Sequence, residues 1–298
     1  MEKTIRIGTR GSKLALWQAH FTQDQLKAIG VESELVIIKT RGDQIQHLGF
    51  DKMEGKGFFT KEIEDALLRG DIDVAVHSMK DLPTQSPEGL VITAVSYREN
   101  PADWLVVRKE EAVAGTTLKL KENAVVGTSS ARRKAQLLHF RPDIQLKDIR
   151  GNVPTRLNKL REGQFDGIVL AAAGLSRLEM DLSAFEVIKF SPKEFIPAPA
   201  QGVLAWQTNE KDIATRRIFK QLHQQNTSVA TNIERKVLRL LDGGCQMPLG
   251  VYCEQDRAGN FHVWAALASA WDQPLKTTRL SSSTHFQLAE QIFEQIKS

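Results

Sequence analysis

The amino-acid sequence predicts an α/β protein with two successive α/β segments, followed by a small α+β domain. In both segments short apolar strands alternate with amphipathic helices, which is the pattern of a mainly parallel sheet covered by helices. A stretch rich in Pro and Ala, FIPAPAQG at 195–202, follows the second segment and indicates a crossover between domains. At 298 residues the chain exceeds the usual size of one domain, so we expect two or three.

The first segment has the order strand, helix, strand, loop, helix, strand. Its expected elements are a strand at 4–8, a helix after Ser12, a strand at 34–39, a helix at 60–69 and a strand at 72–76. Ser12 is suited to cap the first helix and Gly70 to end the second. The pattern lapses at 44–57, where glycines stand among charged residues. We interpret this stretch as a mobile loop over a site, since loops of this length are often functional, and a plain surface loop fits the pattern equally well.

The second segment and the C-terminal domain continue the alternation. Strands are expected at 104–107, 124–127, 144–149 and 166–173, with helices after the second and the third. The run at 166–173 is almost continuously apolar, which suits the centre of a parallel sheet. The C-terminal domain should contain a helix at 228–241, strands near 249–253, 261–267 and 277–282, and a helix at 285–296.

Composition is that of an ordinary globular protein. Charged residues make up 26% of the chain, and a formal net charge of +4 is too small to indicate a nucleic-acid binder. The N-terminus lacks the apolar core of a signal peptide and no apolar run reaches membrane-spanning length, so we expect a cytoplasmic protein. With only two cysteines, Cys245 and Cys253, we expect neither a disulfide framework nor a metal site.

Three turns combine the start of a helix with arginine. They are GTRGS at 8–12, GTSSARR at 127–133 and RGNVPTR at 150–156, and each follows a predicted strand. A helix N-terminus offers free backbone N–H groups and partial positive charge, so with arginine each turn can hold a carboxylate or a phosphate. Ser, Thr and Gly also cap helices for stability alone. The repetition, with Arg177 after a fourth strand, indicates a ligand with several negative groups, and none of the turns has a nucleotide-binding glycine pattern.

The stretch AVHSMKDLPT at 75–84 places titratable groups at the end of a buried strand. Directly after the apolar residues come His77, Ser78, Lys80 and Asp81. In open α/β sheets, ligands bind at this carboxyl edge. The plainer alternative is that Asp81 caps a turn before a proline and that Lys80 is a solvated charge. The arginine turns elsewhere in the chain favour the functional interpretation.

The two cysteines stand in different contexts. Cys245 follows two glycines in a turn, where its thiolate would be accessible to an electrophile. A buried cysteine in a tight turn is the commoner case for a lone thiol. Cys253 lies in the strand pattern VYCEQ and is expected to be a packed residue.

Eight segments together resemble the hydroxymethylbilane synthase family, also called porphobilinogen deaminases. They span essentially the whole chain and are GTRGSKLALWQAH (8–20), TRGD (40–43), GKGFFTKE (55–62), AVHSMKDLPT (75–84), VGTSSARR (126–133), RGNVPTRLNKL (150–160), AAAGLSRL (171–178) and DGGCQMPLG (242–250). The chain departs from the family pattern at two places near the predicted crossovers. Ala102-Asp103-Trp104 replaces Arg-Asp-Ala, and AQGVLAWQ at 200–207 replaces GQGALGIE.

The resemblance implies an enzyme of tetrapyrrole and heme biosynthesis, a transferase that condenses four porphobilinogen molecules head to tail. It would release ammonia and yield hydroxymethylbilane, with the growing chain held on a dipyrromethane cofactor joined to Cys245 by a thioether. The resemblance also implies two lobes like those of a type II periplasmic binding protein, with the active cleft between them. The implied domains are 1–97 with 197–216, then 98–196, and a third domain at 217–298 that carries the cysteine.

Roles of single residues also follow from the resemblance. Asp81 matches the catalytic aspartate. The cofactor-binding residues would be Cys245, Lys80, Asp81, Ser129, Arg132, Arg133 and Arg150. The substrate-binding residues would be Arg10, Ser12, Arg150, Arg156, Arg177, Phe59 and Lys56. Since every porphobilinogen unit carries an acetate and a propionate group, the arginine turns fit a polycarboxylate. We expect a monomer that binds this small molecule, and neither nucleic acid nor a membrane.

Two other classes of protein would share parts of this pattern. A non-catalytic anion-binding protein with the same two-lobe fold would need the arginine turns but neither Cys245 nor Asp81. A nucleic-acid binder would place the arginines on phosphates, and its affinity would depend steeply on salt.

Overall fold

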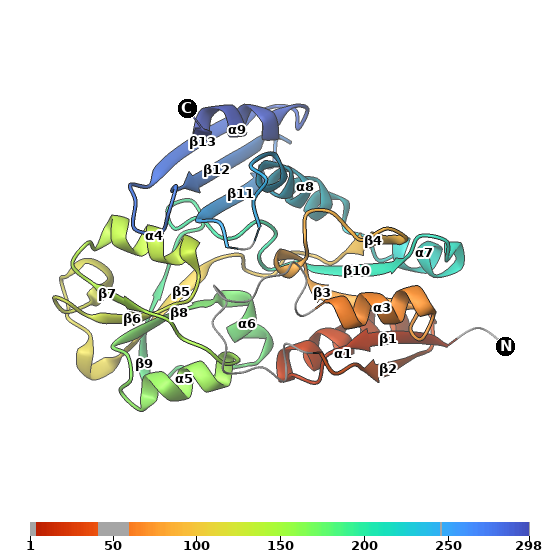
Figure 1. The fold of residues 1–298 in the computed structure, drawn as a ribbon, viewed down its shortest axis with the longest axis horizontal. Coiled ribbons are helices and arrows are strands. Elements are labelled where there is room, and N and C mark those ends of the chain that lie inside the picture. The colour runs from red at the N-terminus through yellow and green to blue at the C-terminus, as the bar shows by residue number, and fades with distance from the viewer. Residues whose placement is uncertain (1–3, 41–59, 245, 298) are drawn as a thin grey trace. The chain divides into compact units, whose positions relative to one another are not determined.

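The computed structural model of the protein describes residues 4–40, 60–244 and 246–297. The described chain forms three sheets with helices against them (Figure 1). It divides into two compact units. One unit comprises 1–98 with 203–228, and the other 99–202 with 229–298. The division into three domains at 97, 197 and 217 stays a prediction. None of the described helices is long and apolar enough to cross a membrane.

The first unit is built on a five-stranded sheet with the order β2-β1-β3-β10-β4. Its strands are β1 (Ile5–Thr9), β2 (Ser33–Ile37), β3 (Val74–Ser78), β4 (Leu90–Val95) and β10 (Leu204–Asn209). The first three run parallel, as their sequences predict, whereas β10 lies antiparallel between β3 and β4. The strands β4 and β10 are missing from the sequence-based prediction, because their partners are far away along the chain.

The helices of this unit are α1 (Lys13–Ala28), α3 (Lys61–Arg69), α7 (Ile213–Lys220) and the first residues of α8 (Gln225–Leu240), with a short 3-10 turn η2 (Met79–Asp81) after β3. Capping residues predict the start of α1 and the end of α3, whereas α7 is missing from the prediction. The Ser12 hydroxyl accepts a hydrogen bond from the Ala15 N–H, and Gly70 ends α3 in the left-handed conformation.

Trp206, at one of the two departures from the family pattern, lies in the core of this unit. It is 1% exposed, packs on Phe219, and donates its indole N–H to the Thr22 hydroxyl at 2.9 Å. A buried tryptophan needs such a partner for its N–H. The substitution therefore changes packing inside the unit.

The second unit contains a five-stranded sheet with the order β7-β6-β8-β5-β9. Its strands are β5 (Asp103–Arg108), β6 (Val125–Gly127), β7 (Gln145–Lys147), β8 (Gly167–Ala171) and β9 (Phe185–Lys189). The prediction that the apolar run at 166–173 forms a central strand parallel to its neighbour is confirmed by β8, which pairs in parallel with β6. On its other side, β5 lies antiparallel to β8 and to β9.

Two helices, α4 (Ala131–Phe140) and α5 (Val153–Arg161), start at the predicted turns of this unit. A third, α6 (Ala172–Arg177), is missing from the prediction and begins where the sequence predicts the end of a strand. The 3-10 turns η3 (Lys109–Glu111) and η4 (Thr117–Lys119) follow β5. The side chain of Ser130 caps α4, and that of Asn152 caps α5. The prediction of strand–turn–helix units at the arginine turns is confirmed.

The C-terminal part of the second unit is the predicted α+β domain. The strands β11 (Leu249–Gln255), β12 (Phe261–Leu267) and β13 (Lys276–Ser282) form an antiparallel sheet, and α8 and α9 (Leu288–Lys297) pack against it (Figure 1). Cys253 is 1% exposed within this core, as the strand pattern predicts. The fold class, two α/β lobes and a small α+β domain, is thereby confirmed.

β11 approaches the crossover segment closely at Gly250. A Cβ atom at this position would lie 2.4 Å from the carbonyl oxygen of Ile196. Because that oxygen belongs to the backbone, it can move away only if the segment shifts. Glycine is therefore required here by space and not by backbone conformation.

We expect Gly250→Ala to lower the free energy of unfolding by about 1–3 kcal/mol, the usual cost of overpacking a filled interior. Urea denaturation measures the change. Gly174→Ala is the matched control, because its Cβ would meet only Val153 at 3.6 Å, an ordinary contact, inside α6. Equal stability of the two variants would contradict the packing argument.

Candidate functional site

In the first unit, β3 runs directly into the turn that carries Lys80 and Asp81. Met79 and Leu82 flank the pair and are each 3% exposed, so they anchor the turn in the core. The Met79 N–H donates to the Val203 carbonyl at 2.9 Å. Between these anchors Lys80 is half-buried and Asp81 is exposed. The fold thus holds the backbone of the turn while leaving the carboxylate accessible.

The turn between β1 and α1 lies at the same edge of the sheet. β1 and β3 are parallel neighbours with Ile7 opposite Val74, so the residues that follow each strand come together. Arg10, which is half-buried, and Ser12 follow β1, and Lys80 and Asp81 follow β3. The structure therefore brings these four predicted residues to one edge of one sheet.

His77 and Ser78 support this turn. Gln18 of α1 donates to the Ser78 hydroxyl at 2.8 Å. His77 is 6% exposed, and burial lowers its pKa to about 4, although a hydrogen bond with Gln207 acts in the opposite direction. The imidazole is therefore neutral at pH 7, and its surroundings suit a structural residue better than a proton carrier.

In the second unit, two predicted arginines converge on one buried carboxylate. Asp103, the first residue of β5, is fully buried. Arg132 donates from Nη1 to its Oδ2 at 2.7 Å, and Arg133 donates from Nη2 to its Oδ1 at 2.6 Å. Gln201 adds a third donor, Nε2, at 3.0 Å from Oδ1.

Both guanidiniums favour the ionised form of Asp103. Burial by itself would raise the pKa of this carboxyl group, but Arg132 and Arg133 outweigh burial and hold the pKa well below its usual range. The aspartate is therefore a fixed negative charge at any physiological pH. Sequence reasoning named Asp103 only as part of a departure from the family pattern. An aspartate at the start of the apolar strand DWLVV is the signal that could have pointed to a buried partner for arginine.

Positive charge exceeds negative charge around this carboxylate. Arg156, at the start of α5, is half-buried, and burial together with the nearby charges of Arg133 and Arg150 lowers its pKa to about 10. Like charges held this close repel one another, and an anionic ligand would relieve the repulsion. The arrangement can bind a molecule with several carboxylates.

Some of the predicted residues also carry structural hydrogen bonds. Arg132 donates to the Ile196 carbonyl at 2.9 Å and Arg133 to the Val169 carbonyl at 2.9 Å. The Ser129 hydroxyl joins the ends of β6 and β7, since it donates to the carbonyl of Ile149 and accepts from its N–H. A guanidinium has five N–H donors, so both arginines keep donors beyond these contacts.

Arg177, the last residue of α6, is 7% exposed and donates from Nη2 to the Gly202 carbonyl at 2.7 Å. Three predicted residues, Lys56, Phe59 and Cys245, lie outside the described residues, as does the loop at 44–57.

The residues on either side of Cys245 form the predicted turn after α8. Gly243 donates its N–H to the Leu238 carbonyl at 3.1 Å, and Met247 donates to the Gly244 carbonyl at 3.0 Å. Gly244 is exposed, and a Cβ atom there would have open space around it.

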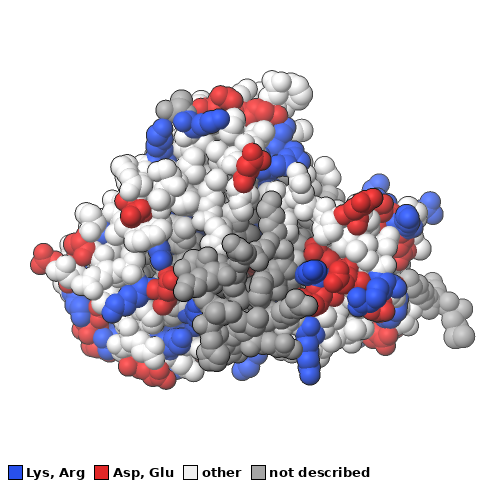
Figure 2. All heavy atoms as spheres, in the orientation of Figure 1, with Lys and Arg blue, Asp and Glu red and all other residues white. Residues whose placement is uncertain are grey.

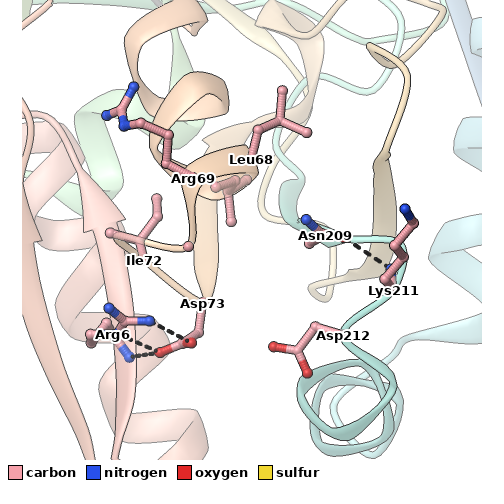
Figure 3. A pocket seen from close by; sticks show the side chains of 10 residues that line it. Arg6, Leu68, Arg69, Ile72, Asp73, Asn209, Lys211 and Asp212 are labelled. Atoms are coloured by element: carbon pink, nitrogen blue, oxygen red, sulfur yellow. Dashed lines mark hydrogen bonds and ion pairs between the residues drawn. The ribbon is translucent and has the colours of Figure 1, made fainter.

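A groove of about 420 Å³ lies elsewhere in the first unit (Figure 3). Arg6, near the start of β1, and Asp73, just before β3, form a bidentate ion pair on its wall, with N–O distances of 3.0 Å. These residues mark the amino edge of the parallel strands, whereas Asp81 follows the carboxyl end of β3. The groove is therefore separate from the candidate site.

Comparison with known proteins identifies the family. The family model described as "Porphobilinogen deaminase, dipyromethane cofactor binding domain" matches residues 5–217. The chain belongs to the porphobilinogen deaminase family. It is 48% identical to the porphobilinogen deaminase of Nitratiruptor sp. over 247 residues, which cover 83% of this chain and 77% of that protein. It is 44% identical to the porphobilinogen deaminase of Chloroherpeton thalassium over 265 residues, which cover 88% of this chain and 82% of that protein.

The chain also resembles solved structures of other proteins, at much lower sequence identity than its porphobilinogen deaminase relatives. A probable amino-acid ABC transporter extracellular-binding protein, ytmK of Bacillus subtilis, is similar with a TM-score of 0.47 and 11% sequence identity. The match covers 74% of this chain and 90% of that one.

The charges on the surface are mixed. On the face shown in Figure 2, the described Lys and Arg side chains lie among Asp and Glu side chains in small groups. An extended nucleic-acid interface requires a stripe or patch of one sign. The face shown gives the nucleic-acid alternative no support among its described side chains.

We expect Asp103→Asn to lower the free energy of unfolding by about 3–5 kcal/mol, because it leaves two buried guanidiniums without their carboxylate. In the wild type, the stability contributed by ionised Asp103 is fully present above the unfolded pKa of 3.8 and is lost as the pH falls below it. Urea denaturation at pH 7 and at pH 3 should therefore show a difference between wild type and variant that shrinks in acid.

Asp148→Asn is the matched control. Asp148 is exposed, and it pairs at 2.7 Å with Lys134 of α4, the helix that also carries Arg132 and Arg133. Such pairs contribute little, and the control should be close to wild type at both pH values. Equal stability of Asp103→Asn and Asp148→Asn would rule out the buried carboxylate as the partner of the arginines.

Proposed function

We propose that this chain condenses four porphobilinogen molecules head to tail, releases ammonia and forms the linear tetrapyrrole hydroxymethylbilane. Family membership supplies the reaction class. The observation that carries the proposal to this chain is the excess of guanidinium groups around Asp103, since each pyrrole unit brings two carboxylates. An accessible carboxylate, Asp81, at the end of a parallel strand provides an acid for the reaction.

The cluster fits the dipyrromethane cofactor of the family. The three arginine side chains that the resemblance assigns to the cofactor suit the carboxylates of its pyrrole rings. Arg132, Arg133, Arg150 and Ser129 would hold these groups. The resemblance adds Lys80 and Asp81, and Cys245 would form the thioether. When bound, the cofactor supplies the pyrrole end to which the first substrate is joined.

The remaining predicted residues would hold the substrate. Arg10, Ser12, Arg156 and Arg177 would bind the acetate and propionate groups, with Arg150 shared between cofactor and substrate. Lys56 and Phe59 belong to this group by resemblance. Bidentate contacts of this kind orient a pyrrole as well as bind it.

Asp81 would move protons during each condensation. As an acid it would protonate the amine that leaves porphobilinogen as ammonia. Its carboxylate would then stabilise the positive charge on the pyrrole and take the ring proton after coupling. General acid–base help of this kind contributes about 10²–10⁴-fold. A monomeric state and a cytoplasmic location stay predictions.

The mass of the intact purified protein tests the cofactor. We expect it to exceed the sequence mass by one dipyrromethane adduct, because the thioether is covalent. Cys245→Ser should remove the adduct and the activity. Cys253→Ala is the control, since Cys253 is packed in the C-terminal core, and it should keep the adduct. A wild-type protein that is fully active without added mass would contradict the cofactor proposal. A wild-type protein that has neither added mass nor activity would favour a non-catalytic anion-binding protein.

The kcat of a substituted protein tests the proposed role of Asp81 as the acid. Asp81→Asn should lower kcat by about 10²–10⁴-fold and keep both the fold and the adduct, because the amide cannot supply or accept the proton. Glu88→Gln, which changes another exposed carboxylate of the same unit, should stay near wild type. A near-normal kcat for Asp81→Asn would assign the proton transfers to another group.

A further inference from the structure

The crossover segment 196–202 contacts two buried arginines of the second unit and also the carboxylate that a third one binds. The Ile196 carbonyl accepts from Arg132 at 2.9 Å, and the Gly202 carbonyl accepts from Arg177 at 2.7 Å. Gln201 reaches Asp103, the carboxylate that Arg133 shares with Arg132. The position of this segment therefore decides where these guanidiniums lie.

The segment contains an unfavourable backbone conformation. Ala200 has a φ of 62°, in the left-handed region that residues with a side chain seldom adopt. It is fully buried, so water cannot satisfy its N–H group. A conformation of this kind persists only when its surroundings hold it in place.

Glu234 of α8 holds the backbone of Ala200 in this conformation. The Ala200 N–H donates to Glu234 Oε2 at 2.6 Å. The other oxygen, Oε1, accepts from the Cys253 N–H of β11 at 2.7 Å. The Glu234 side chain is fully buried, so its carboxylate fastens the crossover to the C-terminal domain through two charge-assisted hydrogen bonds.

We infer that Glu234 is a positioning residue for carboxylate binding in this enzyme. It fixes Ala200, and through the segment 196–202 it sets Asp103 and the arginines. Neither the arginine turns nor the family motifs point to it. The inference rests on the proposed function, because it assigns to Glu234 a share in binding the carboxylates of porphobilinogen.

Glu234→Gln tests the inference. The amide keeps one acceptor oxygen but turns an N–H donor toward one of the two backbone N–H groups. We expect the KM for porphobilinogen to rise about 10-fold or more with a smaller change in kcat, because the arginines bind the carboxylates before as well as during reaction. Wild-type turnover of porphobilinogen tests the proposed function separately.

A second substitution distinguishes positioning from general support. Glycine adopts positive φ without strain, so Ala200→Gly in the Glu234→Gln background should bring KM back to within about threefold of wild type. If Glu234 only stabilised the C-terminal domain through Cys253, Ala200→Gly would leave KM unchanged. Glu234→Asp, which keeps the charge but shortens the side chain, should give a smaller rise in KM with the same rescue and provides the test if the glutamine variant does not fold.

Glu290→Gln is the matched control. Glu290 pairs at the surface with Lys236 of α8, the helix that also carries Glu234, so the substitution removes another carboxylate partner of α8. Its KM should stay within twofold of wild type. An active wild type together with an unchanged KM in both Glu234 variants, or a raised KM that Ala200→Gly does not lower, would overturn the inference.

Discussion

The site in the second unit depends on one buried carboxylate. Asp103 places an oxygen against each of two guanidiniums, so that Arg132 and Arg133 can lie side by side away from water. Two adjacent buried cations without it would repel each other and lose their hydration with no compensation. One carboxylate cannot neutralise two arginines, and Arg150 and Arg156 add to the excess. The pair Arg132 and Arg133 therefore carries one more positive charge than Asp103 balances, which suits an anionic ligand.

The topology of each sheet explains how distant segments reach the ligand edge. At the ligand edge, every parallel strand places its C-terminal end, whereas an antiparallel strand places its N-terminal end. β5 starts at Asp103, which lies opposite Ala171 at the end of β8. In the first unit β10 starts at Leu204, opposite Ser78 at the end of β3. The segment before β5 therefore lies at the edge where α4 begins. In the first unit, the segment before β10 lies at the edge where α1 begins.

Much of this arrangement is predictable from the sequence, because it is local. Apolar periodicity predicts the parallel strands, and Ser12 and Gly70 predict helix ends, since capping involves residues a few positions apart. The pairing of Asp103 with Arg132, 29 residues away, and with Gln201, 98 residues away, has no such local signal. The same holds for β10 and Trp206, whose environment is made by strands from the other end of the chain. The motifs therefore predict the arginines but not the carboxylate that pairs with them.

The two kinds of charged group among the predicted residues have opposite requirements. A guanidinium that binds carboxylates gains from being rigid and shielded from water, because its interactions are stronger at low dielectric. The acid proposed at Asp81 would give a proton to the leaving amine and regain one from the pyrrole ring in each condensation, so it needs access to every new substrate. Arg132 and Arg133 are buried and fixed by backbone carbonyls, whereas Asp81 is exposed on a turn whose neighbours are anchored. The same fold satisfies both demands because a strand end can hold a backbone firmly while its side chain remains in contact with water.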